Sequence, residues 1–171
     1  MCIRDRFEGA YVKDPDLGLH KWIVSFDLNS LYPHLIMQYN ISPETYVGVE
    51  TKGMSVENML NQQLNLDWAK NKDVAISANG AMFRRDKQGF LPELMQKMYG
   101  DRVIYKKKMI EAKKEFQKTK DPIYKNEIAR CHNIQMAKKI SLNSAYGAIG
   151  NQYFRYFEKN QAEAITVGGQ L

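Results

Sequence analysis

Apolar and polar side chains alternate over residues 21–27, and this pattern predicts a β-strand. The side chains expected on one side are Trp22, Val24 and Phe26, and those on the other are Ile23, Ser25 and Asp27. The strand ends at an isolated acid, Asp27. A short helix is expected to follow at once, capped by Asn29 or Ser30 and continuing to about Gln38.

The patterns between residues 40 and 90 are weaker. Residues 40–53 read as a loop, and residues 55–68 are compatible with an amphipathic helix. Residues 82–90 predict a small β-hairpin, because apolar positions flank a turn-forming stretch at 86–89.

Helical periodicity dominates residues 92–149. The apolar stripe of a first long helix falls within about 60° on a helical wheel and consists of Leu94, Met98, Tyr105, Met109, Ala112 and Phe116. The stretch TKDP at 119–122 ends this helix, and a second helix is expected from about Ile123 to Ile149. The two helices should form an antiparallel hairpin, followed by an aromatic strand over QYFRYF and the start of another helix. We therefore expect a mixed α+β fold.

The apolar fraction of the chain is sufficient for a hydrophobic core, and its positive net charge favours acidic partners. The chain has 171 residues, 44% of them apolar, and a net charge of +6. Residues 101–140 hold twelve Lys or Arg against five Asp or Glu, a balance of +7, so the rest of the chain is close to neutral. No apolar run is long enough for a membrane span, and we expect a soluble protein of the cytoplasm without a membrane partner.

Cysteine and histidine usage narrows the chemistry further. Cys2 and Cys131 lie far apart, which favours a reducing compartment over a disulfide framework. His20, His34 and His132 lack the spacing of zinc ligands. The opening residues 1–6 match neither a structural element nor an export signal, and we interpret them as a non-native leader.

The acid at the end of the predicted strand is the first candidate for chemistry. A carboxylate there can hold a hard divalent cation such as Mg²⁺, and the free N–H groups of the helix that follows, from Ser30 to Tyr32, favour phosphate oxygens. This combination suits a triphosphate. The alternative is that Asp27 only caps the helix.

The predicted helical hairpin supplies cations. Arg102 and Lys106 are one turn apart beside the apolar stripe of the first helix. On the second helix a polar face is formed by Lys139, Asn143 and Tyr146, and a small, packable face by Ala137, Ile140, Ser144 and Ala148. Three cations from two adjacent helices could clamp a triphosphate. The alternative is a solvated basic surface without a ligand.

Two motifs resemble those of family B DNA polymerases. FDLNSLYP at 26–33 resembles the first polymerase motif of that family, and KISLNSAYG at 139–147 is similar to the motif of its fingers. NISPET, which follows the first motif, and NQYFRYF, which follows the fingers motif, are most similar to the replicative polymerases of tailed bacteriophages. FEGAYV at 7–12 resembles the segment leading into the palm of that group. The resemblance covers the chain from about Phe7 onward.

The resemblance implies a role for each matching position. Asp27 would be one of two metal-binding aspartates, with the carbonyl of Leu28 as a further ligand, in catalysis with two Mg²⁺ ions. Ser30, Leu31 and Tyr32 would line the triphosphate and sugar pocket, with Tyr32 crowding the position of a ribose 2′-hydroxyl. The implied phosphate ligands are Arg102, Lys106 and Lys139, and Lys139 would also protonate the leaving pyrophosphate.

The same resemblance implies contacts with the substrates. Asn143 would pack beside the incoming nucleotide, while Tyr146 and Gly147 would contact DNA as the floor under the nascent base pair. The implied partners are primer-template DNA, deoxynucleoside triphosphates and, in a replisome, a sliding clamp and other proteins. If the source is viral, the location is the cytoplasm of the host cell. Lys113, Lys114 and Lys118 are expected to solvate the distal half of the hairpin.

The chain also departs from the family pattern. His34 stands where the family usually has a small residue, and we infer a structural role for His34. Phe7 replaces a tyrosine. No Asp-Thr-Asp motif follows the fingers motif. The site would therefore have only one carboxylate, and one carboxylate cannot hold two metal ions in the geometry that catalysis needs. We therefore expect a fragment that does not polymerise DNA alone. Its parts would be an N-terminal part of the palm (7–91), the fingers hairpin (92–149) and a truncated return to the palm (150–171). The rival hypothesis is a noncatalytic basic helical module that binds nucleic acid.

Overall fold

The computed structural model describes residues 13–171 of the chain. The predicted leader, residues 1–6, and the FEGAYV segment at 7–12 lie outside the described residues, as does Cys2. The helices are α1 (Leu31–Tyr39), α2 (Val56–Leu60), α3 (Asp67–Asn71), α4 (Phe90–Thr119), α5 (Pro122–Ile149) and α6 (Lys159–Gly168). The strands are β1 (Tyr46–Val49), β2 (Val74–Ile76) and β3 (Ala81–Arg84). The predicted α+β class is confirmed.

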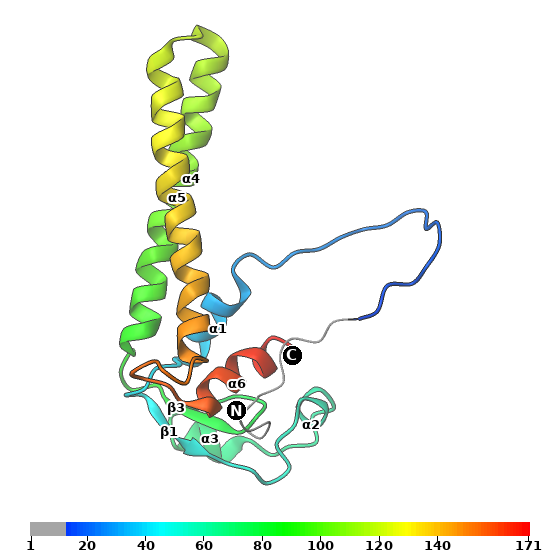
Figure 1. Cartoon of the computed structure of the whole chain (residues 1–171). Coiled ribbons are helices and arrows are strands. Elements are labelled where there is room, and N and C mark those ends of the chain that lie inside the picture. The colour runs from blue at the N-terminus through cyan, green and yellow to red at the C-terminus, as the bar shows by residue number, and fades with distance from the viewer. Residues whose placement is uncertain (1–12) are drawn as a thin grey trace.

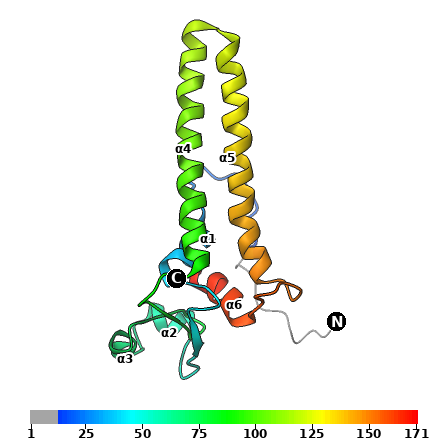
Figure 2. The same ribbon diagram turned by 90° about the vertical axis from the view of Figure 1, so that its left-hand side faces the viewer.

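The predicted helical hairpin is the most prominent feature of the molecule. Helices α4 and α5 run antiparallel and project together from a smaller body that contains the sheet and the other helices (Figures 1 and 2). They are joined by Lys120, whose φ of 59° is left-handed, and by Asp121. The Asp121 side chain accepts a hydrogen bond from the Ile123 N–H at 2.9 Å, and Pro122 stands in the first turn of α5. These features reverse the chain within two residues.

The sheet differs from the prediction. Its order is β1-β3-β2 and both pairs are antiparallel. The hairpin expected over residues 82–90 is wrong, because β3 pairs with the preceding strand β2 through a turn at Ser77–Gly80, and α4 already begins at Phe90. The loop expected over 40–53 is wrong in part, since β1 lies within it and pairs Tyr46 with Phe83.

The single helix expected over residues 55–68 is also wrong. The Ser55 hydroxyl accepts a hydrogen bond from the Asn58 N–H at 3.1 Å and starts α2, but α2 ends at Leu60. Gln62, soon after, has a φ of 54°, which a right-handed helix cannot accommodate. A separate short helix, α3, then begins at Asp67.

Two predicted strands do not form. Residues 21–27 have no strand pairing and run outside the body toward the start of α1 (Figure 1), and the Trp22 and Phe26 side chains are 98% and 92% exposed. Among residues 13–171 no strand lies alongside this segment to complete its hydrogen bonds. The aromatic stretch after Gly150 forms turns, and Tyr153 is 87% exposed. The helix expected after it is present as α6.

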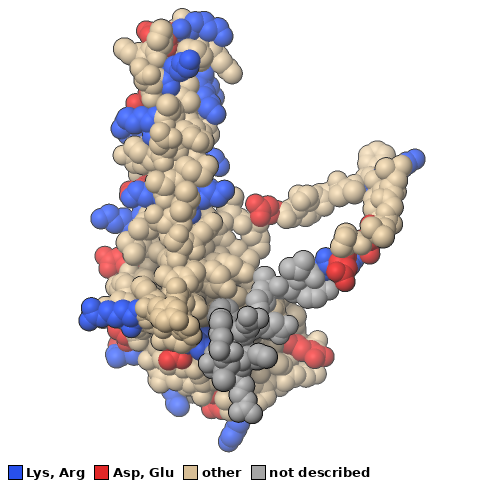
Figure 3. Space-filling model, viewed as in Figure 1, with Lys and Arg blue, Asp and Glu red and all other residues tan. Residues whose placement is uncertain are grey.

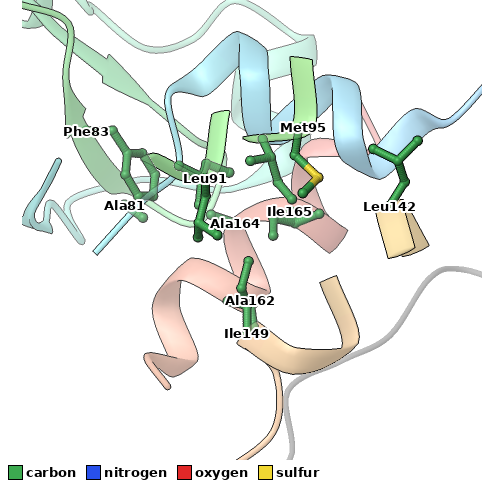
Figure 4. Close-up of a cluster of buried hydrophobic side chains, with 11 residues drawn as sticks. Ala81, Phe83, Leu91, Met95, Leu142, Ile149, Ala162, Ala164 and Ile165 are labelled. Atoms are coloured by element: carbon green, nitrogen blue, oxygen red, sulfur yellow. The ribbon is translucent and has the colours of Figure 1, made fainter. Parts of the chain in front are cut away.

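The core lies where the hairpin meets the body. Helix α6 lies at the base of the hairpin (Figure 1) and contacts α5, α1 and β3. Its Ala162, Ala164 and Ile165 side chains lie within the cluster (Figure 4). The buried members are Ile36, Ile41, Ala81, Phe83, Leu91, Met95, Leu142, Ile149, Ala162, Ala164 and Ile165. Within the described part of the chain, no helix is both long and apolar enough to cross a membrane.

The packed face of α5 is not the one expected from its sequence. Ile140 is 59% exposed, and Ala137 and Ser144 are exposed as well. The buried positions are Cys131, Gln135, Leu142 and Ile149, which follow the seam with α4 and the body. The prediction failed because small and apolar residues occur on several sides of α5, so that burial depends on where α4 lies. On α4, Ala112 is buried as expected, whereas Leu94 is 39% exposed.

Candidate functional site

The start of α1 is held by a side chain from α4. Ser30 has a φ of 54° and its side chain does not cap α1, so the expected capping bond is absent. Instead, Nη1 of Arg102 donates a hydrogen bond to the Ser30 hydroxyl oxygen at 3.0 Å. The Ser30 carbonyl accepts a bond from the His34 N–H at 3.2 Å. The first motif and the basic arm of the hairpin therefore meet at this point.

Aromatic rings join the same motif to α5. The Tyr32 and Tyr146 ring centroids are 4.5 Å apart and the rings are tilted by 41°. Burial raises the pKa of Tyr146, and the nearby Tyr32 hydroxyl adds to this shift. Gly169, at the end of α6, lies so close that a Cβ there would be 3.5 Å from both Leu31 and Tyr32. Tyr32 is thus enclosed by α5 and α6.

The cations on the two arms are only partly engaged. Arg102 is half-buried, and its Nε is buried without a partner among the described residues. Lys106, Lys139 and Asn143 are exposed, and within residues 13–171 none of their side chains forms a hydrogen bond or an ion pair. They add to the basic side chains distributed along the hairpin (Figure 3). This surface can attract an anion near the start of α1.

Asp27 is exposed at the end of the extended segment, three residues before Ser30. Three residues of chain span at most about 11 Å, so the Asp27 backbone lies within that distance of Ser30. The next residue, Leu28, is 70% exposed. Gly147, at the other end of the predicted set, is exposed on α5.

The described residues do not complete a metal centre. No three His, Cys, Asp or Glu side chains of residues 13–171 lie together so as to hold a metal ion. Asp27 and the Leu28 carbonyl offer oxygen ligands of the kind Mg²⁺ prefers, but a site for two ions needs more carboxylates than this chain brings to the start of α1. The expected pair of ions therefore does not fit these residues alone.

Sequence reasoning missed two contacts at this site. The His34 ring makes an edge contact with Tyr99 of α4, with 4.6 Å between centroids, which agrees with a structural role for His34. Asp101 of α4 accepts a hydrogen bond from Nζ of Lys138 of α5 at 2.8 Å. Asp101 is next to Arg102 and Lys138 is next to Lys139, so both members of the ion pair adjoin a predicted phosphate ligand. This was the only indication in the sequence, because the sequence does not show which residues of the two helices lie opposite each other.

The sequence of the chain can be compared with those of known proteins. The sequence pattern of DNA polymerase family B matches residues 2–171, and the chain therefore belongs to that family.

Individual relatives include both viral and archaeal enzymes. The DNA-directed DNA polymerase of Escherichia phage RB69 is 28% identical over 96% of this chain and 22% of its own length. DNA polymerase 1 of Pyrococcus abyssi is 35% identical over 98% of this chain and 18% of its own length. The DNA-directed DNA polymerase of Enterobacteria phage T4 is 29% identical over 99% of this chain and 23% of its own length. The chain thus spans about a fifth of the length of these relatives.

Proposed function

We propose that this chain forms the nucleotide-binding part of a DNA-directed DNA polymerase that adds deoxynucleotides to a primer 3′ end. Its substrates would be primer-template DNA and deoxynucleoside triphosphates, with a sliding clamp or other replisome proteins as further partners. The location that follows for a viral source is the cytoplasm of the host cell. Membership of family B and viral relatives support this proposal.

The observation that carries the proposal is the meeting of both motifs at the start of α1. Arg102 reaches Ser30 at 3.0 Å, and Tyr146 packs on Tyr32 at 4.5 Å between centroids. These contacts join residues 72 and 114 positions apart in sequence. A surface that served only as a solvated basic face would not require them.

The cations would bind the triphosphate. Arg102 would hold its β and γ phosphates at the N-terminus of α1, where helix N–H groups also attract anions. Lys106 and Lys139, exposed and without an ionic partner within residues 13–171, would neutralise the remaining phosphate charge, and Lys139 would donate a proton to the leaving pyrophosphate. A swing of the hairpin would bring these cations onto the correct nucleotide and exclude water.

The remaining roles concern the sugar, the base and the metal ions. Leu31 and Tyr32 would line the sugar pocket, Asn143 would lie beside the nucleotide, and Tyr146 with Gly147 would support the nascent base pair. Asp27 and the Leu28 carbonyl would be this chain's share of the ligands for two Mg²⁺ ions, whose chemistry is to activate the primer hydroxyl and stabilise the leaving group. The other ligands would come from outside residues 13–171.

The role of Asp27 is testable in a chimera. In the phage RB69 polymerase, the segment that matches this chain is replaced by the chain itself. We expect the chimera to extend a primer, and Asp27→Asn to lower the extension rate by at least about 10³-fold, because a metal ligand is lost. DNA binding, measured by fluorescence anisotropy, should change less than about two-fold, because phosphate contacts by Lys and Arg dominate it.

The matched control is Asp14→Asn, which removes an acid from the same exposed segment and should leave extension unchanged. Normal extension by the Asp27→Asn chimera would reject the catalytic role. Loss of DNA binding with Asp27→Asn would favour the rival, a noncatalytic module for nucleic acid. The 171-residue chain alone is expected to show no extension.

A further inference from the structure

An ion pair joins the two arms of the hairpin next to the proposed phosphate ligands. Nζ of Lys138 on α5 lies 2.8 Å from Oδ2 of Asp101 on α4, and the two side chains are 32% and 35% exposed. The pKa of Asp101 is lowered, chiefly by the hydrogen bond from Lys138, with further contributions from the charges of Lys138 and Lys97. By contrast, other ion pairs of the hairpin, such as Glu115 with Lys118, join residues three positions apart on one helix.

The geometry of antiparallel helices relates this pair to the proposed phosphate ligands. Each residue of an α-helix is rotated by about 100° from the one before it. Because α4 and α5 run in opposite directions, the rotation from Asp101 to Arg102 and the rotation from Lys138 to Lys139 lead to the same side of the hairpin. Facing Asp101 toward Lys138 therefore places Arg102 and Lys139 side by side on one surface.

Helix α1 lies on that surface. Arg102 donates to Ser30 at its start, and Tyr146, two turns after Lys139 on α5, packs on Tyr32. The rotation per residue also directs Asn143 to this side. A change of register or of rotation between the arms would thus separate Arg102 from Lys139 even if both helices remained intact.

We propose that Asp101 and Lys138 are positioning residues, which set the spacing and rotation of the two arms so that Arg102 and Lys139 bind one triphosphate. This inference rests on the proposed function. It adds that Lys138, although next to Lys139, is not a phosphate ligand, because its ammonium group is held by Asp101.

Removing the acid distinguishes positioning from a simple charge effect. If Asp101 only contributed its negative charge, Asp101→Asn would make the surface more positive and strengthen the binding of a polyanion. If Asp101 positions the arms, the same substitution weakens binding, because the cations no longer match the spacing of the phosphates. The two explanations predict changes of opposite sign.

The experiment uses the full 171-residue chain, with inorganic tripolyphosphate and then deoxythymidine triphosphate as probes in isothermal titration calorimetry. We expect Asp101→Asn to weaken binding of both probes by about ten-fold, and Asp101→Glu to stay within about two-fold of the parent chain. Far-ultraviolet circular dichroism should show unchanged helix content for both variants. The control Glu115→Gln removes an acid of α4 nearer the tip and should leave affinity unchanged.

A second pair of variants tests Lys138 should Asp101→Asn lose its fold. Lys138→Gln and Lys107→Gln each remove one cation, but only Lys138 pairs with Asp101. Positioning predicts a clearly larger loss of affinity for Lys138→Gln, and near-normal affinity for Lys138→Arg. Equal losses for Lys138→Gln and Lys107→Gln would overturn the proposal, as would tighter or unchanged binding by Asp101→Asn.

Failure of the proposed function has a different signature. If Arg102→Ala and Lys139→Ala leave tripolyphosphate binding unchanged, the triphosphate site is elsewhere and both proposals are wrong. If these two variants lose affinity while Asp101→Asn does not, the site stands and only the positioning role of the ion pair is rejected.

Discussion

Gly89 stands where the chain passes from the sheet to α4, and the loop at Ser42 leaves it no space for a side chain. A Cβ at position 89 would lie 2.5 Å from the Cβ of Ser42 and 3.0 Å from its hydroxyl oxygen. The backbone of Gly89 itself is relaxed, with a φ of −74°. The requirement for glycine is therefore one of close packing, not of backbone conformation.

Gly89→Ala should destabilise the chain by about 1–3 kcal/mol, because the added methyl group forces the loop and α4 apart. The free energy of unfolding in urea measures the effect. Gly100→Ala is the matched control, since a Cβ at position 100 of α4 meets no atom within 4 Å apart from its chain neighbours and the backbone of its own helix. That substitution should stabilise the chain by about 0.5–1 kcal/mol through helix propensity. A neutral Gly89→Ala would contradict the packing argument.

At the scale of residues, the roles predicted for the site residues stay predictions, and the contacts among these residues were not predicted. Arg102 and Tyr146 were singled out from motif and spacing, and each makes a contact with the first motif. Their partners Ser30 and Tyr32 were predicted for nucleotide roles, but the pairing itself depends on how three helices meet. The left-handed backbone of Ser30 had no signal in the sequence, because serine rarely adopts it.

Helix α4 begins without a capping side chain of its own, and a preceding loop supplies one. Because Gly89 cannot cap, the Phe90 N–H donates to Oε1 of Glu44 at 2.6 Å. The Ser42 hydroxyl donates to Oε2 of the same carboxylate at 2.6 Å. Asn40 holds the turn before α4, since its amide donates to two carbonyls there and its oxygen accepts from the Gly89 N–H at 2.8 Å. The base of the hairpin is thereby tied to the body.

The cap at Glu44 predicts a dependence of stability on pH. Partial desolvation raises the pKa of this carboxyl, but the hydrogen bonds from Ser42 and Phe90 outweigh it, so that the pKa lies below its ordinary value of 4.5. A carboxyl with a lowered folded-state pKa stabilises the fold above its unfolded pKa and loses this contribution as the pH falls through the folded value. Glu44→Gln should therefore lower the urea midpoint at pH 7 and have progressively less effect as the pH falls below that ordinary value of 4.5.

The comparison of the two urea midpoints over pH 2–8 tests this directly. Other acids titrate in both proteins, so that only the difference between parent and Glu44→Gln reports on the cap. A difference that grew on acidification would mean that the Glu44 carboxylate is not held by the start of α4.

At the scale of elements, the successful predictions were helices whose pattern lies within one continuous stretch of chain. The hairpin of α4 and α5 was predicted almost to its ends, because apolar periodicity, the break at TKDP and the length of each helix are all local. Strands β1 and β2 were missed, since their pairing joins Tyr46 to Phe83 and Val74 to Arg84. Residues 21–27 have the composition of a strand, but within residues 13–171 no strand pairs with them.

The whole molecule consists of a packed body, a protruding hairpin and an extended segment with apolar side chains in solvent (Figure 1). The segment carries Trp22, Ile23, Val24 and Phe26, which are all 73–98% exposed. Apolar side chains of this size are normally covered in a native protein. The relatives are about five times longer than this chain, and we expect the segment to be covered when the chain is placed within a polymerase of that length.

Tryptophan fluorescence tests that expectation. The chain contains two tryptophans, so Trp68→Phe leaves Trp22 as the reporter. In the 171-residue chain, Trp22 should emit at long wavelength and be quenched by iodide almost as strongly as free tryptophan, because it is 98% exposed. In the RB69 chimera with the native tryptophans outside the segment replaced, emission should shift to shorter wavelength and quenching should fall. Emission at short wavelength from the isolated chain would contradict the exposed segment.

The two-residue connection between the arms bears on the order in which the chain folds. Lys120 and Asp121 reverse the backbone, so each further contact between α4 and α5 closes only a small additional loop. Contacts can therefore form in order from the tip of the hairpin to its base at low entropic cost. The sheet must instead unite Tyr46 with Phe83 across a long intervening segment. The tip of the hairpin should therefore nucleate folding, and closure of the body around α6 should be the slow step.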